Sequence, residues 1–122
     1  MKFELDNYEM LSRAMEEFCS FLEALNVSEE SIFNSKLVTS ELVSNVFQHS
    51  EGSAFLSGEL EQDKICIRVK GTKDFRPPEK STCSDVYAES GRGLYLVDSV
   101  SEERTYLGDG AIRVVIKAHF KK

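Results

Sequence analysis

The sequence predicts an α+β fold, a two-layer α/β sandwich in which helices pack on one face of a mostly antiparallel sheet. Two long helical segments come first, and each of two later segments has the alternation of a β-hairpin. A short third helix separates the hairpins. Runs of helices and runs of strands, rather than strict alternation, are typical of this architecture. At 122 residues the chain is long enough for one domain, residues 1–122, to bury a single core.

The first two helices are predicted from caps and from apolar spacing. Asp6 and Glu9 have the spacing of a capping box, and a break follows at Asn26. Apolar residues recur between them at intervals of four and three: Leu11, Met15, Phe18, Leu22 and Leu25. A second helix is expected from the cap Ser28 to about His49. Apolar residues surround much of it, which predicts a largely buried helix: Phe33, Leu37, Val38, Leu42, Val43, Val46 and Phe47.

The strands are predicted from alternation and turn residues. Residues 54–60 and the alternating stretch 65–70 form the first expected hairpin, around a polar turn at 61–63. Residues 105–107 and 112–120 form the second, around a glycine turn at 108–110. The stretch between the hairpins begins without periodicity and contains Pro77-Pro78, which is typical of a functional lid. It ends in the third helix, from Leu94 to Val100.

Composition and charge exclude several classes of protein. A net charge of −6 with no basic cluster argues against direct binding of nucleic acid. The three cysteines are too scattered for a disulfide framework or a zinc site. The N-terminus lacks a signal region and no apolar run is long enough to span a membrane. A soluble, cytoplasmic protein is expected.

Two motifs together predict a nucleotide pocket. Glu41, Asn45 and His49 are spaced four residues apart, so they form one polar stripe on the second helix. Later, Gly91-Arg92-Gly93-Leu94 follows Ser90 at the start of the third helix. Glycines let backbone N–H groups approach an anion, and a guanidinium can bind phosphate through two hydrogen bonds.

This combination resembles the anti-sigma-factor serine kinases of the GHKL ATPase superfamily. The resemblance rests on E-x-x-x-N-x-x-x-H at Glu41, Asn45 and His49 and on S-G-R-G-L at 90–94, in the order and near the separation found in that family. It covers most of the chain and implies the histidine kinase-like ATPase fold with bound ATP and Mg²⁺. The cofactor-binding residues would be Asn45, His49, Gly91, Arg92, Gly93 and Leu94.

The resemblance also implies roles for individual residues. Glu41 would be the general base that draws the proton from an attacking hydroxyl group, and Asn45 would hold Mg²⁺ through its amide oxygen. Two roles are equally compatible with His49. One is a contact with phosphate or with the lid, and the other is a favourable interaction with the dipole at the helix C-terminus. In isolation Glu41 would be an exposed helix glutamate and the glycine motif an ordinary helix start.

The implied function is a serine/threonine protein kinase that regulates transcription by partner switching. Like its relatives, it would bind a sigma factor and phosphorylate an anti-sigma-factor antagonist, without contacting nucleic acid or a membrane. Relatives of this size often form homodimers, although no interface is identifiable in the sequence. The catalytic domain of a sensor histidine kinase is a weaker alternative, because no phosphoacceptor helix pair precedes the pocket.

The chain departs from the family at the adenine site. The family has V-x-D-x-G where this chain reads Val69-Lys70-Gly71-Thr72-Lys73, so Gly71 replaces the adenine-binding aspartate and Lys73 the glycine. Near the C-terminus Ala111 and Ile112 follow a glycine turn where the family usually has a threonine. These differences favour an alternative function, a non-catalytic regulatory module that kept the fold and lost the adenine site.

Overall fold

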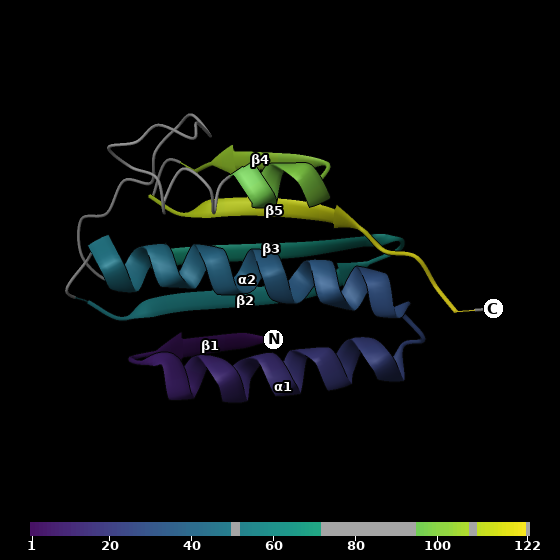
Figure 1. The fold of residues 1–122 in the computed structure, drawn as a ribbon, viewed down its shortest axis with the longest axis horizontal. Helices are drawn as coiled ribbons and strands as arrows, with labels where there is room; N and C mark the ends of the chain where they lie inside the picture. The colour runs from purple at the N-terminus through teal and green to yellow at the C-terminus, as the bar shows by residue number, and fades with distance from the viewer. Residues whose placement is uncertain (50–51, 72–94, 108–109, 122) are drawn as a thin grey trace.

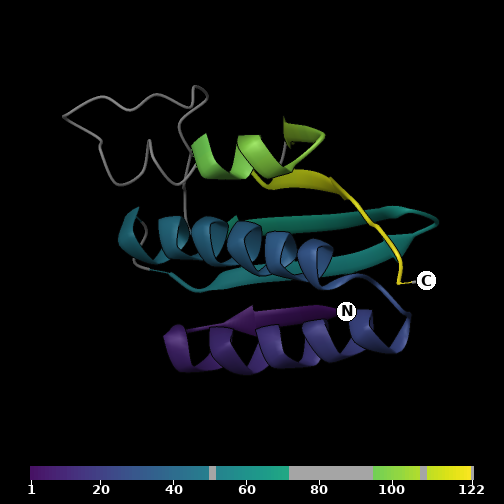
Figure 2. The ribbon, with the colours of Figure 1, turned by 45° about the vertical axis from the view of Figure 1, so that its right-hand side comes forward.

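The computed structural model describes residues 1–49, 52–71, 95–107 and 110–121. Within them, one five-stranded antiparallel sheet has the order β1-β2-β3-β5-β4, and three helices lie on one of its faces (Figures 1 and 2). This confirms the predicted α+β class. The elements in chain order are β1 (Lys2–Leu5), α1 (Tyr8–Ala24), α2 (Glu29–His49), β2 (Ala54–Glu61), β3 (Lys64–Gly71), a helix at 95–100, β4 (Glu103–Tyr106) and β5 (Ile112–Lys117).

Side-chain caps fix the starts of the two long helices. The Asn7 side chain accepts a hydrogen bond from the backbone N–H of Met10 at 2.9 Å, so Asn7 is the N-cap of α1. The predicted cap Asp6 is therefore wrong by one residue. For α2 the prediction is confirmed, because Ser28 Oγ accepts from the backbone N–H of Ser31 at 3.3 Å.

The sheet contains one strand that the sequence did not predict. β1 pairs with β2 in the register Leu5↔Ala54, and the N-terminal ammonium group of Met1 donates to the carbonyl of Gly58 at 2.8 Å. Both predicted hairpins are present in outline. β2 and β3 pair over their full length, and β5 lies between β3 and β4.

The core lies between the helical layer and the sheet. The helix residues Leu22, Val38 and Val43 and the strand residues Ile65 and Ile67 are fully buried there. Two expected core residues are exposed instead, Leu25 at 44% and Phe33 at 65%. Leu25 is the C-cap residue of α1, beyond its last turn, and Phe33 lies on a part of α2 that faces away from the sheet.

The third helix is confirmed over residues 95–100, and Val97 anchors it with no exposed surface. Leu94, the predicted lid and the turn at 108–109 lie outside the described residues. In the part of the chain that is described, no helix combines the length and apolarity needed to cross a bilayer.

Candidate functional site

Several predicted site residues lie at one end of the fold. In Figure 1 the last turn of α2 and the end of β3 lie at the left of the view, whereas the helix at 95–100 lies over β4 and β5, nearer the middle. The register Val69↔Ile112 places the start of β5 beside the end of β3. The end of β3 at Gly71 and the start of β5 at Ile112 are therefore neighbours, and the C-terminal end of α2 lies at the same end of the sheet.

Asn45 is the most unusual residue at this end. Its exposed fraction is 4%, and it lies two helical turns after the core residue Val38, on nearly the same side of α2. Its side-chain nitrogen Nδ2 is buried and has no hydrogen-bond partner among the described residues. A buried amide donor left without an acceptor costs about 1–3 kcal/mol. Such a group is therefore a candidate for binding a ligand rather than for stabilising the core.

Glu41 lies one helical turn before Asn45 and is partly buried. Burial removes water from its carboxylate and so raises the pKa of Glu41 above its ordinary value. A carboxylate with a raised pKa is a stronger base once it is ionised. The two side chains share one side of α2, as the four-residue spacing predicted.

The other predicted site residues are only partly placed. His49 is the last residue of α2, and its side chain lies outside what the structure describes. The glycine motif, Gly91-Arg92-Gly93-Leu94, also lies outside the described residues. The helix at 95–100 lies on the same face of the sheet as α2 (Figures 1 and 2).

Core packing and an ion pair hold the helix at 95–100 on the sheet. Val97 is fully buried in the core. Asp98 Oδ1 forms an ion pair with Arg104 Nε of β4 at 3.3 Å, and the Arg104 side chain is only 10% exposed. The Arg104 guanidinium also lies over the ring of Tyr106, 5.6 Å from its centre. The segment after the glycine motif is thus attached firmly to β4.

Among the described residues, the position at which the sequence predicted an adenine site has no polar side chain. Gly71 is buried and continues the regular pairing of β3, opposite Ala54. Ala111 has no exposed surface, and its carbonyl accepts from the N–H of Leu107 at 2.8 Å. Lys73 lies outside the described residues. Neither Gly71 nor Ala111 offers the carboxylate or hydroxyl that the resembling family uses there.

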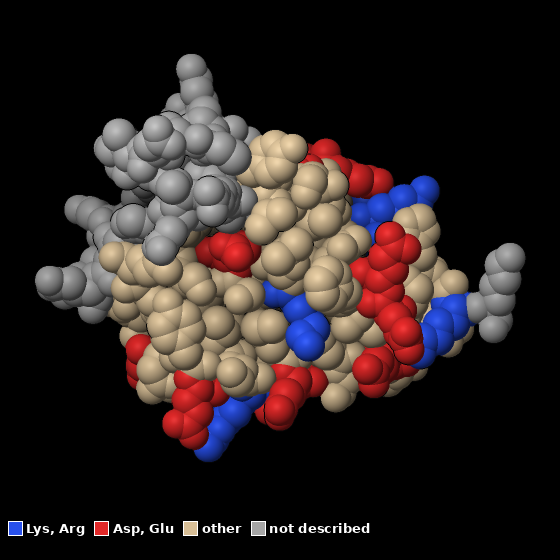
Figure 3. All heavy atoms as spheres, in the orientation of Figure 1, with Lys and Arg blue, Asp and Glu red and all other residues tan. Residues whose placement is uncertain are grey.

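Metal binding at this site would depend on few protein ligands. Within the described ranges, no group of three histidine, cysteine, aspartate or glutamate side chains could hold an ion. Figure 3 shows a mostly uncharged surface over the left part of α2, with one acidic group near the middle of the view, whereas charged residues gather along the lower edge and at the right of the molecule. A cation here would be held by the Asn45 amide oxygen together with oxygens of a ligand.

Sequence reasoning missed a second group of residues, which lie on the helix-free face of the sheet. Lys2, Phe55, Arg68 and Lys70 line a groove there. The alternation of β3 was recognised, and it correctly placed Arg68 and Lys70 on the face opposite Ile67 and Val69. The partners on β1 and β2 depend on strand pairing, which the sequence pattern did not reveal.

Comparisons of the chain with protein-family models and with curated proteins find no match.

Proposed function

We propose that this chain is an ATP-binding protein of the GHKL type that acts as an anti-sigma-factor serine/threonine kinase. In this role it would bind a sigma factor and phosphorylate an antagonist protein. The observation that carries the proposal is Asn45, a buried amide without a partner among the described residues, one turn after the partly buried acid Glu41. Both lie in the second half of α2, the helix that packs on β3 and β5.

The proposal gives each residue a definite task. Asn45 would hold Mg²⁺ through its amide oxygen, and its buried nitrogen would donate to an oxygen of the ligand. Glu41 would orient the acceptor hydroxyl group and take its proton, a task that its raised pKa favours. Backbone N–H groups at 91–94 would bind phosphate. Bound ATP would supply the phosphoryl group, and the bound Mg²⁺ would neutralise the negative charge of the phosphates during transfer.

A second function is favoured by the adenine position. Gly71 and Ala111 are both buried and carry no polar side chain, so the amino group of adenine would lack its charged acceptor. The loss of a hydrogen bond to a charged group weakens binding by about 1.5–3 kcal/mol, roughly ten- to hundredfold. The alternative is a non-catalytic regulatory module of the same fold that binds its protein partners without ATP.

Calorimetric titration with Mg-ATP and Mg-ADP separates the two functions. For the kinase we expect micromolar binding by the parent chain and its loss in Asn45→Ala, with Asn34→Ala of the same helix as the matched control. For the non-catalytic module we expect no binding by the parent and a gain in Gly71→Asp, provided that circular dichroism shows this variant to be folded. Binding that is unchanged in Asn45→Ala would contradict both proposals.

Phosphoryl transfer needs a separate measurement. Glu41→Gln should keep Mg-ATP binding within about twofold, because the side chain acts on the acceptor hydroxyl group. Transfer to a serine of the antagonist should fall by at least about a hundredfold. Equal loss of binding and transfer would show that Glu41 positions the nucleotide and is not the general base.

A further inference from the structure

The outer side of the helical layer carries a groove of about 560 Å³ between α1 and α2. Met15 and Cys19 of α1 line it, one helical turn apart, and both are half-buried. Ser12 lies at the same side, and Lys36 closes the groove from α2. Two long helices that run side by side form the walls, so the groove is elongated (Figure 1).

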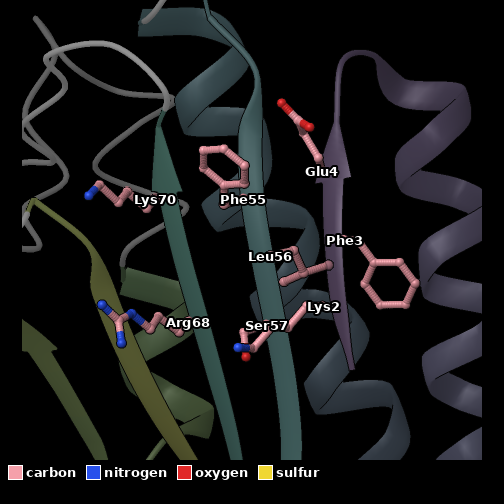
Figure 4. A pocket seen from close by; sticks show the side chains of 8 residues that line it. All are labelled: Lys2, Phe3, Glu4, Phe55, Leu56, Ser57, Arg68 and Lys70. Atoms are coloured by element: carbon pink, nitrogen blue, oxygen red, sulfur yellow. The ribbon is translucent and has the colours of Figure 1, made fainter.

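This groove lies apart from the other two sites on the molecule. The rings of Phe47 on α2 and Tyr8 on α1 have their centres 5.0 Å apart, so the side of α2 that carries Phe47 faces α1. Asn45 comes two residues earlier and therefore lies on nearly the opposite side of the helix. The groove around Phe55 lies on the helix-free face of the sheet (Figure 4). The inference below is thus independent of the proposed function.

The two walls carry charges of opposite sign. Glu16 and Glu23 of α1 are exposed and lie seven residues apart, which is two helical turns or about 10.5 Å along the axis. Lys36 lies on the wall that α2 provides. Among the described residues, no ion pair involves Glu16, Glu23 or Lys36. Their charges are therefore accessible to a ligand that lies along the groove.

Large apolar side chains are exposed near both ends of the helix pair. Phe33, one turn before Lys36, is 65% exposed, and Tyr8 at the start of α1 is 52% exposed. Leu37 and Met15 are half-buried. Methionine is unbranched and adapts its shape to a partner, which suits a binding surface. An apolar strip therefore runs along the groove, with the two acidic residues at one edge.

We propose that this groove binds an amphipathic α-helix of a partner protein, with an apolar stripe bordered by two basic residues seven positions apart. A helix that lies along α1 repeats the spacing of about 10.5 Å between Glu16 and Glu23, so its two basic residues reach both carboxylates. Its apolar stripe covers Met15 and Cys19, as in other helix-in-groove complexes. An acidic residue at its other edge would face Lys36.

Other occupants fit the groove less well. Glu16 and Glu23 would repel the anionic headgroups of a membrane surface. A second copy of the chain would have to supply the basic edge from one of its own long helices. α1 and α2 contain one basic residue each, Arg13 and Lys36, so neither of them provides two at the required spacing.

The test is a titration with a synthetic helical peptide of about 20 residues, followed by ¹⁵N–¹H correlation spectra. The peptide has a leucine stripe with two lysines seven positions apart at its edge. A matched peptide of the same composition carries both lysines on the side opposite the leucines. We expect saturable shifts at the backbone amides of residues 12–23 and 33–37, and binding of the matched peptide weaker by at least about fivefold. Equal binding of the two peptides, or shifts confined to the sheet, would overturn the proposal.

Paired variants test the acidic edge. Glu16→Gln with Glu23→Gln should weaken the first peptide by at least about fivefold and remove its advantage over the matched peptide. Glu17→Gln with Glu59→Gln removes the same charge at two exposed positions outside the groove, and this control should bind as the parent does. Equal weakening by the two double variants would show that the peptide follows net charge alone, contrary to the proposal.

A second pair of variants tests the apolar strip. Phe33→Ser should weaken both peptides at least about threefold, whereas Phe55→Ser, which removes an exposed ring from the helix-free face, should weaken neither. Sedimentation of the chain without peptide is measured in parallel. A dimer that Phe33→Ser dissociates would replace the partner helix by a second copy of the chain.

Discussion

Gly58 of β2 lies directly against the ring of Phe18 of α1. A Cβ atom built on Gly58 would be 2.7 Å from Phe18 Cζ, closer than real Cβ contacts come. Phe18 itself is buried, with 4% of its surface exposed. Glycine is normally unfavourable inside a strand, because it has no side chain to pack. At this position its absence of a side chain is what lets α1 approach the sheet, and the pair therefore sets the spacing between the two layers.

Gly58→Ala should lower the free energy of unfolding by about 1–3 kcal/mol, the usual cost of overpacking a core. Urea unfolding followed by circular dichroism measures this change. The matched control is Ser57→Ala, the neighbouring residue on the open face of the sheet, which should change stability by less than about 0.5 kcal/mol. In a Phe18→Leu background the cost of Gly58→Ala should shrink, and strictly additive effects would show that the two residues do not press on each other.

The sequence predicted those parts of the fold that depend on local signals. The cap at Ser28, the periodicity of α2 and the alternation of β3 each lie within one segment, and all three are confirmed. β1 was missed because its four residues form a strand only by pairing with β2, which lies some fifty residues later in the chain. Phe33 was wrongly placed in the core, because an apolar residue on a long helix does not reveal which side the sheet will cover.

For the candidate site, too, only the features that depend on local signals were predicted. The spacing of Glu41 and Asn45 predicted one side of one helix, which α2 provides. That Asn45 would be buried without a partner among the described residues could not be predicted, because it depends on how α2 packs in the folded chain. The groove at Phe55 was missed for the same reason, since its lining residues come together only in the folded sheet.

Asp98→Asn should weaken the attachment of the helix at 95–100. The ion pair with Arg104 is neither fully exposed nor fully buried, so the expected loss of stability is about 1–2 kcal/mol, between the values for surface and buried pairs. Thermal unfolding measures it. Glu9→Gln removes the largely exposed pair with Arg13 and should cost less than about 0.5 kcal/mol. Equal effects of the two substitutions would mean that Arg104 does not depend on Asp98.

Asn45→Leu should stabilise the protein while it removes the proposed ligand contact. Leucine has the same branched skeleton, although it is larger, and it has no unsatisfied donor, so we expect a gain of about 1 kcal/mol in unfolding free energy. Asn34→Leu on the same helix is the control, and it should give no comparable gain because Asn34 is only half-buried. A loss of stability in Asn45→Leu would instead show that the amide is satisfied within the folded chain and is not held ready for a ligand.

Glu41→Gln should stabilise the protein at neutral pH and not in acid. Burial raises the pKa of Glu41 in the folded state above that in the unfolded chain, so the folded state binds more protons between the two values. The protonated Glu41 therefore makes its full contribution to stability below the pKa of the unfolded chain. This contribution is lost as the pH rises through the pKa of Glu41 in the folded state.

The glutamine variant lacks this loss, because its side chain is neutral at every pH. Its advantage over the parent should be below about 1 kcal/mol near pH 7, since Glu41 keeps some contact with solvent, and it should vanish near the ordinary glutamate pKa of about 4.3. Urea midpoints measured across this range test the sign. Glu17→Gln on the exposed face of α1 is the control. A Glu41→Gln variant less stable than the parent at pH 7 would indicate that the carboxylate has a stabilising partner in the folded chain.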